Sequence, residues 1–124
     1  MLIGLGSDIV SVIRIAGVAS RRHGFAGRIL ARTEMEIYEE RKRSPEFLAG
    51  RFAAKEAFLK ALGTGLGNGI LFPEIEIRPG ASGNPLIDFR GRAMDVFRSI
   101  GGKKAFVSIS HEKDYALAVA VIEG

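Results

Sequence analysis

Cysteine is absent from the sequence, which excludes disulfide bonds, thiolate metal sites and a cysteine nucleophile. Tryptophan is absent as well, and the chain has only two histidines. No uninterrupted apolar run is long enough to span a bilayer. The start of the chain has no basic segment, and its apolar run meets Asp8 too early for a signal peptide. We therefore expect a cytoplasmic protein that has no membrane partner.

The length and the residue pattern indicate one domain of mixed structure. With 124 residues, 47% of them hydrophobic, the chain can build its own core. Helical patterns come mostly early and period-2 patterns mostly late, so we expect an α+β fold with helices packed on an antiparallel sheet. The expected elements are a buried strand at 2–10 ending in an acid, two short helices within 11–31 broken near Gly24, a helix from Thr33, a helix from Pro45 to Gly63, two strands within 74–90, a helix at 91–102 and a hairpin at 104–123.

Local signals set the ends and the place of several elements. Thr33 and Glu36 have capping-box spacing, which predicts that a helix starts there. Ser44 followed by Pro45 is typical of an N-cap and a first helical residue. The strand at 115–123 is apolar on both sides, so we expect it at the centre of the sheet or buried in an interface.

The helix expected at 45–62 carries its charges in unusual places. At about 100° per residue, its smallest side chains form one stripe: Ala53, Ala54, Ala57 and Ala61. Arg51, Lys55, Glu56 and Lys60 fall between apolar sectors instead of opposite them. A plain ion pair between Glu56 and Lys60 would contribute only about 0.3 kcal/mol. A carboxylate among large apolar groups needs a cation, which favours a function for Glu56. Lys55 has no evident role.

Asp8 is the second carboxylate of interest. It follows an apolar run, where a charge is costly unless it is paired or bound to a metal. An aspartate that initiates a turn is an equal alternative. If Asp8 and Glu56 converge, they suit Mg²⁺, which proteins commonly hold with one or two carboxylates, waters and substrate phosphates. Lys60 would then add charge for a polyphosphate. A structural oligomer in which both acids form salt bridges stays open.

Positive charge is concentrated in one segment. The formal net charge is +4, and residues 14–32 include no acid but five arginines: Arg14, Arg21, Arg22, Arg28 and Arg32. Such a patch indicates an anionic partner, which is a nucleic acid, a phosphorylated cofactor or an acidic protein. A small nucleic-acid-binding module is the main alternative function. Those modules usually interleave aromatic residues for stacking, and this segment offers only Phe25.

Two further patterns carry less information. The glycine-rich segment 63–69 follows a helix and precedes a strand, the reverse of the order in dinucleotide and P-loop motifs. It is either a mobile loop or a loop that approaches a ligand. Ser110 and His111 are adjacent on a strand and point to opposite faces, so they cannot form a catalytic dyad. His111 either caps the strand or contacts a ligand.

Four blocks of the sequence resemble the holo-acyl-carrier-protein synthases. "GSDIVSVIRI" and "FLAGRFAAKEAFLKALGTG" look like the two signature blocks of that family. "FVSISHEKDYALAVAVIE" is similar to its C-terminal hairpin, and "GNPLI" resembles its Gly-x-Pro turn. The blocks run in family order from Gly4 to Glu123. The resemblance implies a 4′-phosphopantetheinyl transferase-like fold in one domain, residues 1–124.

The resemblance also implies a reaction and its partners. Coenzyme A would donate its phosphopantetheine arm to a serine of an acidic apo acyl carrier protein and release adenosine 3′,5′-bisphosphate. Mg²⁺ would be the cofactor, and the activity would support fatty acid biosynthesis. No nucleic acid partner is expected.

By position, five residues match functional positions of the family. Asp8 matches the first metal-ligating acid and Glu56 the second. Lys60 matches a lysine near the pyrophosphate, while Arg51 and His111 match positions near the coenzyme A nucleotide. Our hypothesis for the base that takes the serine proton is Glu56, acting directly or through a metal-bound water.

Other positions follow from the same resemblance. Pro85, in the Gly-x-Pro turn, is expected to contact the coenzyme A nucleotide, and Gly63 and Gly65 would let the backbone turn beside that nucleotide. Val10 stands where longer, two-repeat relatives carry a further acid, which suggests a water ligand instead. It also points to the short class, which forms homotrimers with active sites between subunits. The residues in the helix that docks the carrier protein are Arg14, Arg21, Phe25 and Arg28.

Overall fold

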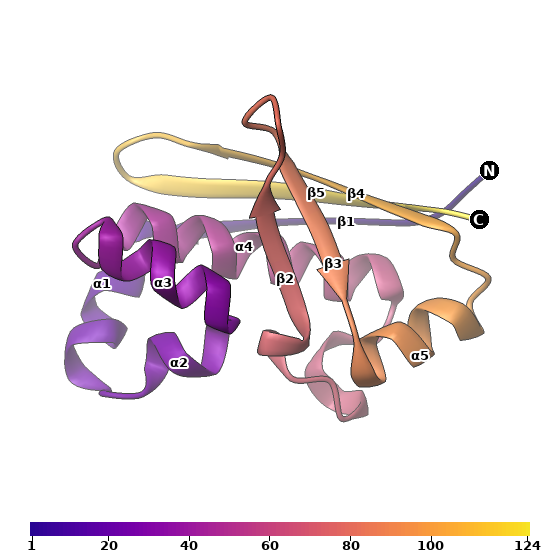
Figure 1. The fold of residues 1–124 in the computed structure, drawn as a ribbon, viewed down its shortest axis with the longest axis horizontal. Helices are drawn as coiled ribbons and strands as arrows, with labels where there is room; N and C mark the ends of the chain where they lie inside the picture. The colour runs from indigo at the N-terminus through magenta and orange to yellow at the C-terminus, as the bar shows by residue number, and fades with distance from the viewer.

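The computed structural model describes all 124 residues, except for the side chain of Leu66. It shows the expected α+β fold (Figure 1). The strands are β1 (Leu2–Ser11), β2 (Ile75–Pro79), β3 (Pro85–Phe89), β4 (Lys104–His111) and β5 (Tyr115–Glu123). The helices are α1 (Val12–Arg21), α2 (Phe25–Ile29), α3 (Arg32–Glu40), α4 (Pro45–Leu62) and α5 (Gly91–Ser99), with 3₁₀ turns η1 (Gly65–Asn68) and η2 (Phe72–Glu74). None of the helices described is both long and apolar enough to cross a membrane.

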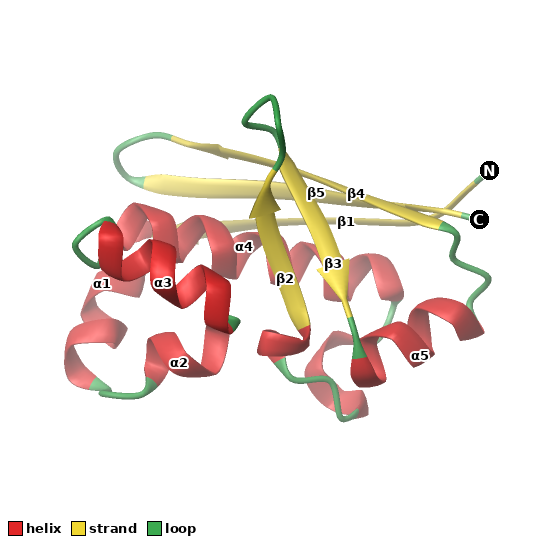
Figure 2. Ribbon diagram, in the orientation of Figure 1, coloured by secondary structure: helices red, strands yellow, loops and turns green.

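The main sheet has three antiparallel strands in the order β1-β5-β4, so β5 is central as predicted. The β2–β3 hairpin forms a separate two-stranded sheet that crosses in front of α4 (Figure 2). The helices lie on one face of the main sheet, and its other face is open (Figure 1). The strand β5 alternates accordingly, with Ala116, Ala118, Ala120 and Ile122 buried toward α4.

The central helix α4 packs directly against the sheet because both surfaces are made of small residues. A Cβ atom added at Gly6 would lie 2.1 Å from the carbonyl oxygen of Ala57, and one at Gly4 would lie 2.2 Å from that of Ala61. Only glycine permits this approach. The alanine stripe of α4 thus faces β1 and β5. The helix ends as predicted, since Ser44 Oγ accepts from the Phe47 N–H and Gly63 is the left-handed C-cap with φ 82°.

Two details of the predicted elements were wrong. The strand β1 is not fully buried and does not end at the acid, because it is an edge strand that continues to Ser11 with Asp8 inside it. The helix α3 begins at Arg32, and its cap is the Glu34 carboxylate, which accepts from the Ala31 N–H at 2.8 Å. Thr33 is therefore not the N-cap.

Candidate functional site

Three of the predicted site residues meet where β1 lies against α4. Lys60 donates from Nζ to Asp8 Oδ1 at 3.1 Å and to the Ser7 carbonyl oxygen at 2.8 Å. Glu56 lies one turn before Lys60 on α4, and the negative charge of Asp8 raises the pKa of its carboxyl. We call Asp8, Glu56 and Lys60 the open cluster. The sheet and helix bring these groups together because Gly6 lets the backbones approach.

The electrostatics of the open cluster favour a bound cation. Burial raises the pKa of the Glu56 carboxyl above its ordinary value, the negative charge of Asp8 raises it further, and Lys60 opposes the shift. Two carboxylates that repel each other in a half-buried place are stabilised by a cation between them. Lys60 makes its ion pair with Asp8, so it neutralises only part of the negative charge.

The donor set of the open cluster fits Mg²⁺ with few protein ligands. Val10, two residues after Asp8, is 2% exposed and belongs to the hydrophobic core. Within the described part of the chain, no three His, Asp or Glu side chains gather as a metal site. Asp8 and Glu56 are thus the two carboxylates that could bind a metal ion here. Mg²⁺ commonly takes one or two carboxylates and completes its shell with waters and substrate phosphates, which matches this set.

An apolar pocket of about 740 Å³ opens beside Glu56. Its aromatic wall is continuous, because the ring centroids of Phe25 and Phe52 lie 6.3 Å apart and those of Phe52 and Phe72 lie 5.6 Å apart. Two cationic side chains, Arg22 and Arg28, also line the pocket. The pocket therefore presents one carboxylate to a ligand among apolar and cationic groups.

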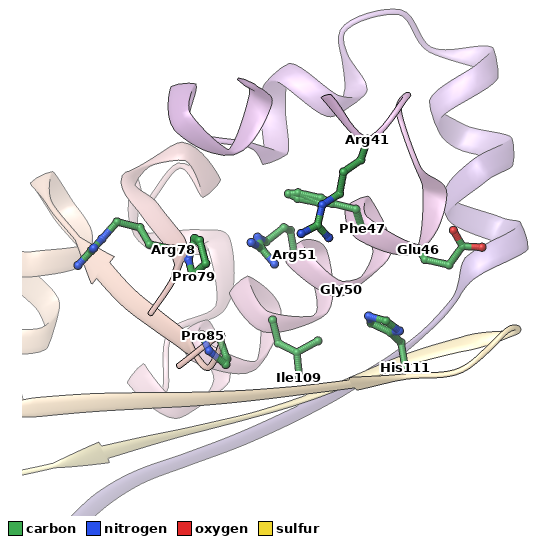
Figure 3. A pocket seen from close by; sticks show the side chains of 11 residues that line it. Arg41, Glu46, Phe47, Gly50, Arg51, Arg78, Pro79, Pro85, Ile109 and His111 are labelled. Carbon is green, nitrogen blue, oxygen red and sulfur yellow. The ribbon is translucent and has the colours of Figure 1, made fainter. Parts of the chain in front are cut away.

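A second, cationic pocket of about 200 Å³ lies between α4, the β2–β3 turn and β4. It contains three residues that the sequence analysis assigned to nucleotide binding: Arg51, Pro85 and His111. Figure 3 shows the imidazole of His111 rising from β4 below the guanidinium groups of Arg41 and Arg51. Such a concentration of positive charge suits a phosphorylated ligand.

The cationic pocket is also lined by Phe47, Arg41 and Arg78, none of which was predicted. The centroid of the Phe47 ring lies 4.4 Å from Arg51 Cζ and 5.3 Å from Arg41 Cζ. The ring therefore makes cation–π contacts with both guanidinium groups. Arg78 comes from β2. Its place just before the turn that contains Pro85 is the signal that could have identified it. Arg41 gave no comparable signal.

Gly63 and Gly65 lie apart from the cationic pocket. Both have positive φ, 82° and 61°, and they follow α4 directly after Lys60. Neither is among the residues that line the pocket of Arg51 and His111. Gly63 and Gly65 therefore lie beyond the C-terminal end of α4, outside the lining of the cationic pocket.

The predicted docking residues form an exposed face on α1 and α2. Arg14 and Arg21 are exposed on α1, Arg28 is exposed on α2, and Phe25 is half-buried. Phe25 and Arg28 also line the apolar pocket next to Glu56. Phe25 and Arg28 thus connect this cationic face with the pocket that contains Glu56.

Comparison with known proteins gives the family. A family model described as the 4′-phosphopantetheinyl transferase superfamily matches residues 4–120. A holo-[acyl-carrier-protein] synthase of Bacillus subtilis (strain 168) is 47% identical over 125 residues, which cover 99% of this chain and 97% of the relative. The synthase of Shewanella woodyi is 44% identical over 133 residues, which cover 99% of both.

Solved structures agree with this match. The holo-[acyl-carrier-protein] synthase of Neisseria meningitidis superposes with a TM-score of 0.91 at 38% identity, over 100% of both chains. The enzyme of Helicobacter pylori, solved in complex with coenzyme A, gives a TM-score of 0.83 at 34% identity and covers 96% of this chain and 99% of its own. The chain belongs to the 4′-phosphopantetheinyl transferase superfamily.

Proposed function

We propose that this chain transfers the 4′-phosphopantetheine arm of coenzyme A to a serine of apo acyl carrier protein and releases adenosine 3′,5′-bisphosphate. The relatives named above are holo-acyl-carrier-protein synthases, and one solved relative holds coenzyme A. The observation that carries the proposal is the meeting of Asp8, Glu56 and Lys60 at one point of the fold. A cytoplasmic location and a part in fatty acid biosynthesis belong to the same proposal.

In this reaction the serine oxygen forms a bond to the phosphorus that carries the pantetheine arm. The bond from that phosphorus to the leaving phosphate of adenosine 3′,5′-bisphosphate breaks. Glu56 takes the serine proton, directly or through a bound water, in the role of a general base. Lys60 stabilises the charge on the leaving phosphate or donates a proton to it. Positioning and charge neutralisation supply most of the catalysis in such transfers.

We propose Asp8 and Glu56 as the residues that hold Mg²⁺. When bound, the ion neutralises the pyrophosphate and makes the phosphorus more electrophilic. The support is the donor set, which offers two carboxylates and no third acid at Val10.

The nucleotide of coenzyme A is assigned to the cationic pocket with Arg51, Pro85 and His111. The pocket and the open cluster lie on different sides of α4, because Arg51 and Glu56 are five residues apart, or about 140° around the helix. One subunit would therefore present the pocket and its neighbour the cluster to the same coenzyme A. This geometry supports active sites between subunits.

The open face of the main sheet supports a homotrimer. Its large apolar side chains are solvent-exposed in the single chain: Leu5 (67%), Ile9 (63%), Phe106 (52%), Tyr115 (51%) and Leu117 (42%). An apolar patch of this kind commonly marks a protein interface. A monomer by light scattering at micromolar concentration would contradict the trimer.

The carrier protein is proposed to dock on the exposed arginines of α1 and α2, which attract an acidic partner. Its serine would then reach Glu56 through the apolar pocket that Phe25 and Arg28 line.

The test of the function is to incubate the protein with coenzyme A, Mg²⁺ and a panel of apo carrier proteins, of fatty-acid and polyketide type. Mass spectrometry should show the phosphopantetheine increment on the carrier. No increment on any carrier would favour a nucleic-acid-binding module or a structural oligomer, and the panel also identifies the preferred carrier.

A further inference from the structure

A buried ion pair lies between the two pockets. Glu34 on α3 and Lys55 on α4 both have side chains that are 0% exposed, and Lys55 Nζ lies 2.5 Å from Glu34 Oε1. We call these two residues the closed pair. Neither residue belongs to the proposed chemistry, and a buried ion pair is weak support for stability, since apolar residues of similar volume often stabilise as well. The contacts of the pair with neighbouring groups, above all that of Glu34 with Arg51, indicate a role beyond stability.

Lys55 uses all its hydrogen-bonding capacity inside the protein. Besides Glu34, its ammonium donates to the carbonyl oxygen of Ile29 at 2.6 Å and to that of Phe72 at 3.3 Å. Three donors meet three acceptors, so Lys55 has none left for a ligand. Its effect is to fix the Glu34 carboxylate in one place.

Glu34 is held on its other sides as well. Oε1 also accepts from the Ala31 N–H at 2.8 Å, and Oε2 accepts from the Ile77 N–H at 3.0 Å. The helix α4, the α2–α3 connection and β2 thus immobilise this carboxylate. Its Oε2 atom faces Arg51 Nε at 3.5 Å.

Among the described residues, Glu34 is the acid with which Arg51 forms an ion pair. The Nε of Arg51 is buried and has no hydrogen-bond partner, so no protein hydrogen bond fixes this part of the guanidinium. Burial lowers the pKa of Arg51, the charge of Glu34 opposes that shift, and nearby Arg41 adds to it. Arg51 therefore sits between an attractive carboxylate, a repelling cation and the ring of Phe47 on which it stacks.

We propose that Glu34 is a positioning residue, which holds the guanidinium of Arg51 toward the cationic pocket so that it binds the phosphorylated nucleotide of coenzyme A. Lys55 fixes the Glu34 carboxylate by donating to its Oε1. The inference rests on the proposed function, because it takes the ligand of Arg51 to be coenzyme A. Glu34 itself touches no substrate.

The test is a double-mutant cycle on coenzyme A binding, measured by calorimetry with the intact protein. Glu34→Gln should weaken binding roughly tenfold, since a charge-assisted contact is lost. Arg51→Gln should weaken it at least as much. In the Arg51→Gln background, Glu34→Gln should change the affinity by less than about twofold. A change of that size is within the scatter of such double-mutant comparisons. The matched control is Glu36→Gln, an exposed glutamate on the same helix, which should bind as the wild type does.

A merely structural role of Glu34 predicts a different result. The loss caused by Glu34→Gln would then be equal in both backgrounds, and the Michaelis constant for the carrier protein would rise with that for coenzyme A. Either outcome would overturn the proposal, as would an unchanged affinity of Glu34→Gln. If circular dichroism shows that Glu34→Gln does not fold, Glu34→Asp replaces it in the cycle, because it keeps the charge but withdraws it from Arg51.

Failure of the proposed function has its own signature. A wild-type protein that neither binds coenzyme A nor modifies any carrier would refute the function. A wild-type protein that does both, with a Glu34 effect that persists undiminished without Arg51, would refute the positioning role alone.

Discussion

Two lysines on the same helix, Lys55 and Lys60, differ in what their ion pairs leave free. The closed pair of Lys55 and Glu34 is fully buried, whereas the Lys60 and Asp8 side chains are 52% and 18% exposed. Lys55 gives its three donors to the protein, while Lys60 has two protein acceptors and faces solvent. The saturated ion pair fixes geometry, and the unsaturated one can exchange partners with a substrate. Stability should therefore depend on the first and turnover on the second.

The largest effect is expected from Lys55→Met, which removes one partner of the closed pair. The Glu34 carboxylate then stays buried without its main counter-charge, which costs about 3–5 kcal/mol of unfolding free energy. Burial already lowers the pKa of Lys55, and the charge of Glu34 opposes that shift. Urea denaturation followed by circular dichroism measures the loss. A loss under about 1 kcal/mol would mean that the closed pair behaves like a surface pair.

Much of the fold was predictable because its signals are local. Ser44, Pro45 and Gly63 define the ends of α4 from within that helix, and the apolar pattern of 115–123 indicates a central strand. The start of α3 was missed because its segment contains four glutamates, and only the packed structure shows that Glu34 turns back onto Ala31. The spacing of residues in the sequence does not show which of these glutamates caps the helix.

The site was predictable in its residues and less so in their surroundings. Asp8, Glu56 and Lys60 stood out because their charges interrupt apolar patterns. The partner of Lys55 was not accessible from the sequence, since Glu34 lies 21 residues earlier in a segment that looks solvent-exposed. The contact also depends on the carbonyl oxygens of Ile29 and Phe72, which side-chain patterns do not reveal.

The next largest effect is expected from Glu56→Gln in the open cluster. Loss of a general base should lower turnover roughly 100-fold or more with saturating Mg²⁺, while the free energy of unfolding stays close to that of the wild type. Single-turnover transfer to an apo carrier protein, followed by mass spectrometry, measures the rate. Asp95→Asn on α5, an exposed acid outside the site, is the control. Near-normal turnover of Glu56→Gln would remove the base role from this residue.

A smaller effect is expected from Arg14→Asp on the exposed face of α1. Reversing one charge of the docking patch should raise the Michaelis constant for the carrier protein roughly tenfold, and more at low salt. The affinity for coenzyme A should hardly change, because Arg14 lies outside the cationic pocket. Arg98→Asp at the end of α5 is the matched charge reversal. Equal losses for carrier and coenzyme A would place Arg14 in the nucleotide site.

The smallest effect is expected on the stability of Lys60→Met, the counterpart of Lys55→Met on the same helix. The half-exposed pair with Asp8 should contribute no more than about 1 kcal/mol to the unfolding free energy. Salt should reduce this contribution further, because exposed charges are screened over about 10 Å at 0.1 M ionic strength. The loss in Lys55→Met should be insensitive to salt, since its pair is out of contact with solvent. Parallel urea titrations of both variants at low and high salt measure the difference. If Lys60→Met lost as much stability as Lys55→Met, the ion pair of Lys60 and Asp8 would be a structural contact. The solvent exposure of an ion pair would then no longer distinguish a substrate site from a structural contact.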